Sequence, residues 1–170
     1  MRKNFLLLVS LLFLGCGFYS FSGSPLTGIK TIGIPVFENQ TLEYGISESL
    51  TDTLINLFVR DNTLKMTNEK KADSVLKGTI LKYERGAYTF DANESVKEYK
   101  VRIFVDVSFE DKKHKKTLWE QKNMEGWGVY SVVAIPTSSG ADSIETEDMG
   151  KARAIKKLAE DILNKTVKGW

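Results

Sequence analysis

The clearest pattern in the chain is an alternation of apolar and polar side chains between Tyr99 and Phe109. A period of two residues predicts a β-strand that has one face on a core and the other available to water or to a partner. The apolar face comprises Tyr99, Val101, Ile103, Val105, Val107 and Phe109. The opposite face comprises Lys100, Arg102, Phe104, Asp106 and Ser108.

Weaker alternation predicts further strands on both sides of this one. Strands are expected at residues 30–37, 64–67, 75–83 and 118–126. Because Pro35 cannot donate to a β-ladder, the first strand should lie at an edge or carry a bulge there. Residues 86–94 and 111–116 are polar and are expected to be loops, the second a charged hairpin tip, whereas 129–135 is apolar but ambiguous.

Two segments repeat apolar residues every three or four positions, a spacing typical of amphipathic helices. They lie at residues 42–60 and 145–167. With the strands, they predict an α+β two-layer sandwich, in which both helices pack on one face of a mostly antiparallel sheet of four to five strands. The other face would then be exposed, with Lys100, Arg102 and Phe104 on it.

The N-terminus predicts export and lipidation. Arg2 and Lys3 precede an apolar run over residues 5–14, which is typical of a signal peptide. Roughly 10 apolar residues rise only about 15 Å as a helix, half of a bilayer's hydrocarbon core. The sequence Leu14-Gly15-Cys16 resembles a lipobox, in which a small residue precedes the cysteine that receives diacylglycerol. Residues 1–15 are therefore expected to be removed.

Cys16 is the only cysteine of the chain. A lone thiol is reactive in an oxidising compartment, so lipidation explains it better than the alternative of a buried thiol in an ordinary helix. A diacylglyceryl group and a further N-linked chain such as palmitate would hold the protein essentially permanently. Gly17, in place of an Asp, favours the outer membrane, with the protein on its periplasmic side. Residues 16–28 would form the tether and 29–170 a single domain.

The charge balance excludes a bulk electrostatic footprint for nucleic acid. The chain has 24 Lys and Arg against 22 Asp and Glu, and the loss of Arg2 and Lys3 with the signal peptide leaves 22 against 22. No segment after Cys16 is long and apolar enough to cross a bilayer. Any binding of anions must therefore come from local patches.

The composition argues against enzymatic chemistry. The single histidine, His114, lies within a run of lysines and is expected to be a solvated loop residue. One His and a lipidated Cys cannot provide a zinc site, and Gly126-Trp127-Gly128 lacks the Lys-Ser/Thr of a phosphate-binding loop. Carboxylates near residue 145 are explained by helix capping. We expect neither a cofactor nor a metal, and the composition disfavours an exported hydrolase.

Two groups of cations are candidates for binding a phosphorylated lipid. The first comprises Lys112, Lys113, Lys115 and Lys116 at the predicted hairpin tip; either they grip anions or they form a solvated turn that discourages edge aggregation. The second is Lys100 and Arg102, which share a sheet face with Phe104. That face would suit a phosphoglycolipid head group and its proximal acyl part, or it is an ordinary wet surface.

Several short motifs, in order along the chain, resemble the LptE family of lipopolysaccharide-assembly lipoproteins. They are Gly15-Cys16-Gly17-Phe18-Tyr19, the segment from Ile29 to Thr41, the segment from Ala72 to Ile80, and Leu118-Trp119-Glu120. The resemblance implies a plug subunit inside the LptD outer-membrane β-barrel, which helps the barrel assemble and helps pass lipopolysaccharide to the outer leaflet. Only the lipidated Cys16 transfers from the family to a position here.

An alternative function belongs to another class. The same export signal and α/β domain would suit a periplasmic structural lipoprotein that oligomerises in a secretion-channel or surface-fibre assembly system. A stable ring would favour this alternative, whereas a monomer would favour the lipopolysaccharide-assembly subunit.

Overall fold

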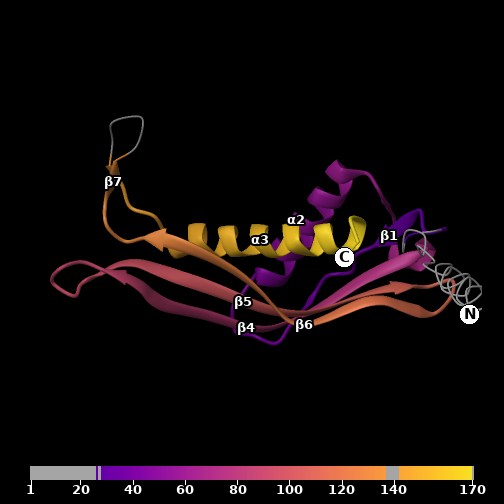
Figure 1. The fold of residues 1–170 in the computed structure, drawn as a ribbon, viewed down its shortest axis with the longest axis horizontal. Helices are drawn as coiled ribbons and strands as arrows, with labels where there is room; N and C mark the ends of the chain where they lie inside the picture. Colours follow the sequence, from indigo (N-terminus) through magenta and orange to yellow (C-terminus); the bar gives the residue numbers. More distant parts are fainter. Residues whose placement is uncertain (1–25, 27, 137–141, 170) are drawn as a thin grey trace, which may run out of the picture.

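The computed structural model describes residues 26, 28–136 and 142–169, which form a sheet with two helices on one face (Figure 1). The predicted α+β two-layer class is confirmed, although the main sheet of the described residues has six strands. In chain order the elements are β1 (Thr31–Gly33), β2 (Glu38–Asn39), α2 (Ile46–Asp61), β3 (Lys65–Met66), the 3-10 helix η1 (Glu69–Lys71), β4 (Ser74–Phe90), β5 (Val96–Asp111), β6 (Lys116–Ser131), β7 (Ile135–Pro136), β8 (Asp142–Ser143) and α3 (Glu147–Val167).

The sheet is built around a long antiparallel meander of β4, β5 and β6. The order of strands is β3-β1-β4-β5-β6, and the short β1, β2 and β3 join in parallel, β2 at the side of β4. The predicted alternation of β5 is confirmed, because Val101, Ile103 and Val105 are fully buried while Lys100 is half-buried and Arg102 is exposed. The β5 strand therefore has a helix-covered face and an open face.

Proline interrupts the first predicted strand. Pairing of β1 ends at Gly33 and resumes at Glu38 in β2, so Pro35 lies between two ladders, where its missing N–H leaves no gap in either. The strand is not at an edge, however, because β1 lies between β3 and β4.

The predicted loop over residues 86–94 is wrong in its first half. The β4 strand continues to Phe90, with Gly86 opposite Lys100 and Phe90 opposite Val96. Backbone pairing with β5 sustains the strand here without an apolar face, since residues 85–88 are all exposed. The strand β6 likewise extends to Ser131, which resolves the first part of the ambiguous segment 129–135.

Glycines let α3 lie very close to β6. A methyl group at Gly128 would collide with the carbonyl oxygen of Gly150, and one at Gly126 with Leu158. The sequence Gly126-Trp127-Gly128 is therefore a packing motif, which agrees with its exclusion as a phosphate loop. Because side chains alternate along a strand, the same motif turns Trp127 to the open face.

Different structural elements lie at the two ends of the elongated domain (Figure 1). The first described residues, β1 and the turn between β5 and β6 lie at one end. The turn between β4 and β5 and the small β7–β8 ladder lie at the other. Within the described ranges, no helix has the length and apolarity that a membrane span needs.

Candidate binding surface on the open sheet face

Lys100 lies between two exposed aromatic rings on the open face. Its ammonium group is 3.8 Å from the centroid of the Tyr88 ring and 5.2 Å from that of Trp127. Tyr88 is 48% and Trp127 44% exposed. Three neighbouring strands thus contribute one cation and two accessible rings, an arrangement that offers an anion partner together with flat apolar surface.

Arg102 extends this group along β5. Its guanidinium is 5.6 Å from the Phe104 ring centroid and 2.6 Å from Glu84. A hydrogen bond from Lys82 and the charge of Arg102 lower the pKa of Glu84. Arg102 is therefore partly neutralised within the protein, which leaves Lys100 as the stronger candidate for contacting an anion.

Tyr88, Lys100 and Arg102 line a shallow depression of about 640 Å³ between β4 and β5, and Trp127 and Phe104 adjoin it through their contacts with the two cations. We call the group the aromatic-cation patch, and its members are Tyr88, Lys100, Arg102, Phe104 and Trp127. The sequence prediction that Lys100, Arg102 and Phe104 share a face is confirmed by the alternation of β5. It did not identify Tyr88 or Trp127, which belong to neighbouring strands.

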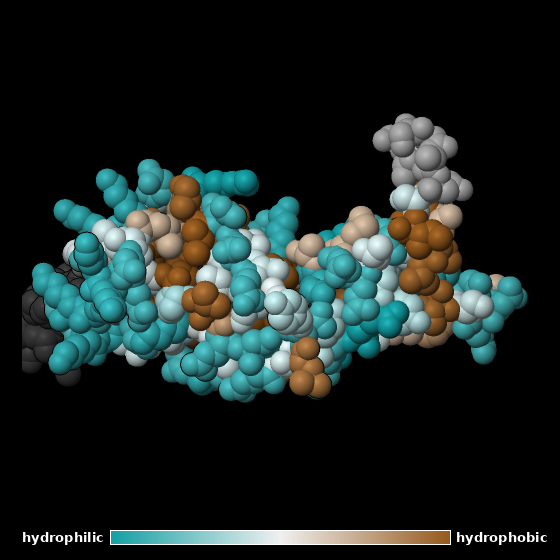
Figure 2. All heavy atoms as spheres, turned by 180° about the vertical axis from the view of Figure 1, so that it is seen from behind, coloured by the Kyte–Doolittle hydropathy of each residue, from teal (hydrophilic) through white to brown (hydrophobic). Residues whose placement is uncertain are grey.

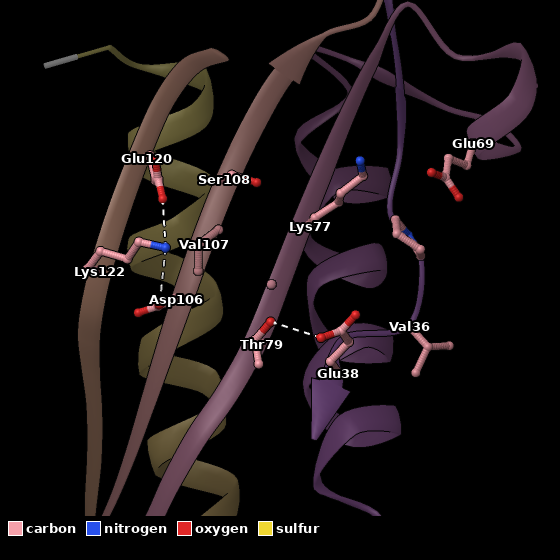
Figure 3. A pocket seen from close by; sticks show the side chains of 12 residues that line it. Val36, Glu38, Glu69, Lys77, Thr79, Asp106, Val107, Ser108, Glu120 and Lys122 are labelled. Carbon is pink, nitrogen blue, oxygen red and sulfur yellow. Dashed lines mark hydrogen bonds and ion pairs between the residues drawn. The ribbon is translucent and has the colours of Figure 1, made fainter. Parts of the chain in front are cut away.

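A second depression farther along the open face has a different charge (Figure 3). Lys122 spans it, with its ammonium group 3.2 Å from Asp106 and 2.7 Å from Glu120. The backbone N–H of Asn123 and the side chain of Lys122 lower the pKa of Asp106. Because Glu38 and Glu69 also line this depression, the middle of the open face carries more carboxylates than cations and is poorly suited to phosphate.

The basic hairpin predicted at residues 111–116 forms the turn between β5 and β6 at the opposite end of the sheet from the aromatic-cation patch. Twelve residues of extended chain separate Lys100 from Lys112, which corresponds to roughly 40 Å. The structure therefore does not bring the two predicted groups of cations together, and they form two separate surfaces.

Lys112 connects this turn to η1. Its ammonium group donates to the carbonyl oxygens of Glu69 and Lys70, the latter at 3.3 Å. Lys70 and Lys71 thereby join the hairpin lysines, and the sequence analysis did not identify them as candidates. We call the resulting group the basic end. It comprises Lys70, Lys71, Lys112, Lys113, Lys115 and Lys116, all exposed.

His114 lies in the same turn and pairs with Asp111. The backbone N–H of His114 donates to one oxygen of Asp111 at 3.0 Å, and the ring Nδ1 is 2.6 Å from the other. These bonds, the ring contact first, lower the pKa of Asp111. His114 therefore stabilises the turn between β5 and β6 through its two contacts with Asp111.

Exposed apolar residues cluster at the end of the domain opposite the basic end, at the base of the β7–β8 ladder (Figure 2). The exposed residues there are Val133, Ile135, Ile144 and Met149. Cys16, the predicted lipidation site, and most of the 16–28 tether lie outside the described residues.

The chain belongs to the LptE family, described as lipopolysaccharide-assembly, because the model of that family matches residues 29–166. The match covers both helices up to Thr166 and all strands of the main sheet. The family predicted from the short motifs is therefore confirmed. A search of curated protein sequences finds no match.

Solved structures share the fold at low sequence identity. A protein from Xanthomonas campestris has a TM-score of 0.52 and 9% identity, over 81% of this chain and 84% of its own. The hypothetical protein from Chlamydia trachomatis has a TM-score of 0.50 and 9% identity, over 81% and 95%. The minor lipoprotein from Acinetobacter baumannii has a TM-score of 0.48 and 13% identity, over 83% and 94%. At these identities the first two show the fold alone.

Proposed function

We propose that this protein is a lipopolysaccharide-assembly lipoprotein, held through Cys16 on the periplasmic side of the outer membrane. It plugs an LptD-like β-barrel, helps that barrel assemble and contacts lipopolysaccharide on its way to the outer leaflet. The observation that carries the proposal is the family match over residues 29–166. The export and lipidation pattern at residues 1–16 supports the location. The role is one of binding and assembly, without catalysis.

The aromatic-cation patch supports a contact with the lipopolysaccharide head group. Phosphates on the sugar would meet the ammonium group of Lys100, and the sugar ring would lie against Tyr88 or Trp127. Arg102 would add a second cation when it exchanges Glu84 for a phosphate. Lys112, Lys113, Lys115 and Lys116 remain a separate predicted contact for the same ligand.

The head-group contact is tested by measuring lipopolysaccharide binding to the purified full-length protein in detergent. The variant Lys100→Glu with Arg102→Glu should bind on the order of tenfold or more weakly, because two favourable charges become two repulsive ones. Raising the salt concentration should weaken binding to the unaltered protein. A variant with Glu at each of the four hairpin lysines tests the second predicted contact.

Lys156→Glu is the matched control, because Lys156 is an exposed cation on α3. It should leave binding unchanged. Equal affinities for the open-face variant, the control and the unaltered protein would remove the aromatic-cation patch from the proposal. Binding that ignores salt would contradict phosphate recognition.

A further inference from the structure

We propose that the basic end docks on the anionic phospholipid head groups of the leaflet that holds the lipid anchor, which fixes the domain's orientation on that membrane. The inference rests on the lipidation of Cys16 in the proposed function. It adds a contact with phospholipid that is distinct from the lipopolysaccharide contact at the aromatic-cation patch, and it gives the four hairpin lysines another ligand than the lipopolysaccharide predicted for them. Three features of the basic end carry it: converging lysines, recessed carboxylates and the position at which β1 begins.

The lysines converge from two segments distant in sequence. Lys70 and Lys71 come from η1, whereas the other four come from the turn between β5 and β6. The bonds from Lys112 to the carbonyl oxygens of Glu69 and Lys70 hold the segments together. The ammonium group of Lys112 is engaged in these bonds, and the five other exposed lysines at this extremity form a surface that can face a plane of phosphates.

The carboxylates of this end are mostly engaged and set back from the lysines. Asp73 accepts from the backbone N–H groups of Lys30 and Thr31, both at 3.0 Å, and is half-buried. Asp111 is buried and bonded to His114. Glu110 pairs with Lys77 at 3.2 Å, while Glu69 is exposed. The outer rim therefore presents more positive than negative charge.

The first described strand, β1, begins at this same end. Asp73 holds Lys30 and Thr31 through its carboxylate, and its own carbonyl oxygen accepts from the backbone N–H of Lys112 at 2.9 Å. The segment 16–28, even fully extended, reaches at most about 45 Å. The basic end is thus the part of the sheet that lies closest to the point where the tether joins the domain.

A lipid chain and a polybasic surface reinforce each other in membrane attachment. Each lysine near an anionic surface favours contact on the order of fivefold, within a Debye length of about 10 Å. The aromatic-cation patch, at the other end of β5, would then lie away from that leaflet.

The test is lysine footprinting of the full-length lipoprotein, reconstituted into vesicles of phosphatidylcholine with or without phosphatidylglycerol. An uncharged amine-reactive reagent labels exposed lysines, and mass spectrometry reads each position. Phosphatidylglycerol should slow labelling of Lys113, Lys115 and Lys116 at least fivefold, and added salt should reverse the protection. Lys156 on α3 is the internal control and should label equally in both vesicles.

The variant Lys70→Gln with Lys113→Gln and Lys116→Gln should abolish the protection of Lys115, whereas Lys156→Gln should not. Equal labelling of the basic end in both vesicles would overturn the proposal. Protection that requires lipopolysaccharide in place of phosphatidylglycerol would also overturn it. Either result could occur with lipopolysaccharide binding at Lys100 intact, so failure here is distinguishable from failure of the proposed function.

Discussion

Three glycines set the distance between α3 and β6. The backbone carbonyl of Gly150 lies where a side chain at position 128 would begin, and the ring of Tyr130 lies 2.7 Å from where one at position 150 would begin. A side chain at position 126 would likewise collide with the side chain of Leu158. No neighbouring atom at position 128 can move away cheaply, because the obstacle is the backbone of α3.

Gly128→Ala should therefore destabilise the protein by about 1–3 kcal/mol, since overpacking moves a helix off the sheet. Gly86→Ala is the matched control: Gly86 also lies in a long strand of the meander, but open space surrounds it. It should be neutral or slightly stabilising. Chemical unfolding of the two purified variants measures the difference, and equal stabilities would contradict the close packing of α3.

Asp73 directly precedes β4 and connects it to two other parts of the chain. Its hydrogen bonds reach Lys30 and Thr31 at the beginning of β1, and Lys112 in the turn between β5 and β6. Backbone and side-chain hydrogen bonds, from Lys30 first and then from Thr31, lower the pKa of its carboxyl group below the ordinary value of 3.8. A depressed pKa in the folded state stabilises the protein above the unfolded pKa. That contribution is lost as the pH falls through the folded value.

Asp73→Asn should lower the free energy of unfolding by about 1–2 kcal/mol at pH 7, because the acceptor loses its charge. The difference from the unaltered protein should begin to shrink as the pH falls below about 4, because the carboxyl group of the unfolded chain is protonated there before that of the folded protein. Urea unfolding at pH 7 and at pH 3 measures it. A difference that is the same at both values would show that the charge of Asp73 contributes nothing.

At the scale of elements, Arg85 connects the distal part of β4 to α3. Its guanidinium lies 4.0 Å from the centroid of Tyr99, donates to the hydroxyl of Tyr130 and lies 3.3 Å from Glu147 at the start of α3. Tyr83 also donates to Glu147, at 2.7 Å. These contacts replace the apolar packing that the end of the meander lacks.

Arg85→Met should accordingly raise the rate of amide hydrogen exchange in residues 84–90 and leave that of residues 76–80 unchanged, since Leu76 and Ile80 anchor the latter segment in the core. The expected loss is about 1–2 kcal/mol of local stability. Lys82→Met on the open face is the control. If residues 84–90 exchange at the same rate in Arg85→Met and in the Lys82→Met control, strand pairing alone holds the distal part of the meander.

The same elements show how far sequence pattern predicts this fold. The alternation of β5 and the stripes of the helices were readable because each buries one face against the core. The end of β4 was missed because its side chains are exposed on both faces, so no apolar period exists. Lys100 and Arg102 could be placed on one face, but Tyr88 reaches Lys100 across strands whose register shifts between Ala87 and Thr89. A single sequence does not reveal that shift.

At the scale of the whole molecule, the candidate binding surfaces lie at different places along the length of the domain. The basic end lies beside the point where the tether joins, the aromatic-cation patch lies on the open face toward the other end, and exposed apolar residues surround β7 and β8 (Figure 2). Such an arrangement would suit a subunit that is tethered to a membrane at one end and contacts its partners along its length.

Isolation of the protein from detergent-solubilised outer membranes tests the proposed role most directly. A tagged full-length chain should recover a large β-barrel protein in stoichiometric amount, identified by mass spectrometry, and a Cys16→Ala variant should recover much less. Recovery of the chain alone, as a stable ring in sizing chromatography, would contradict the role in lipopolysaccharide assembly and favour a structural lipoprotein.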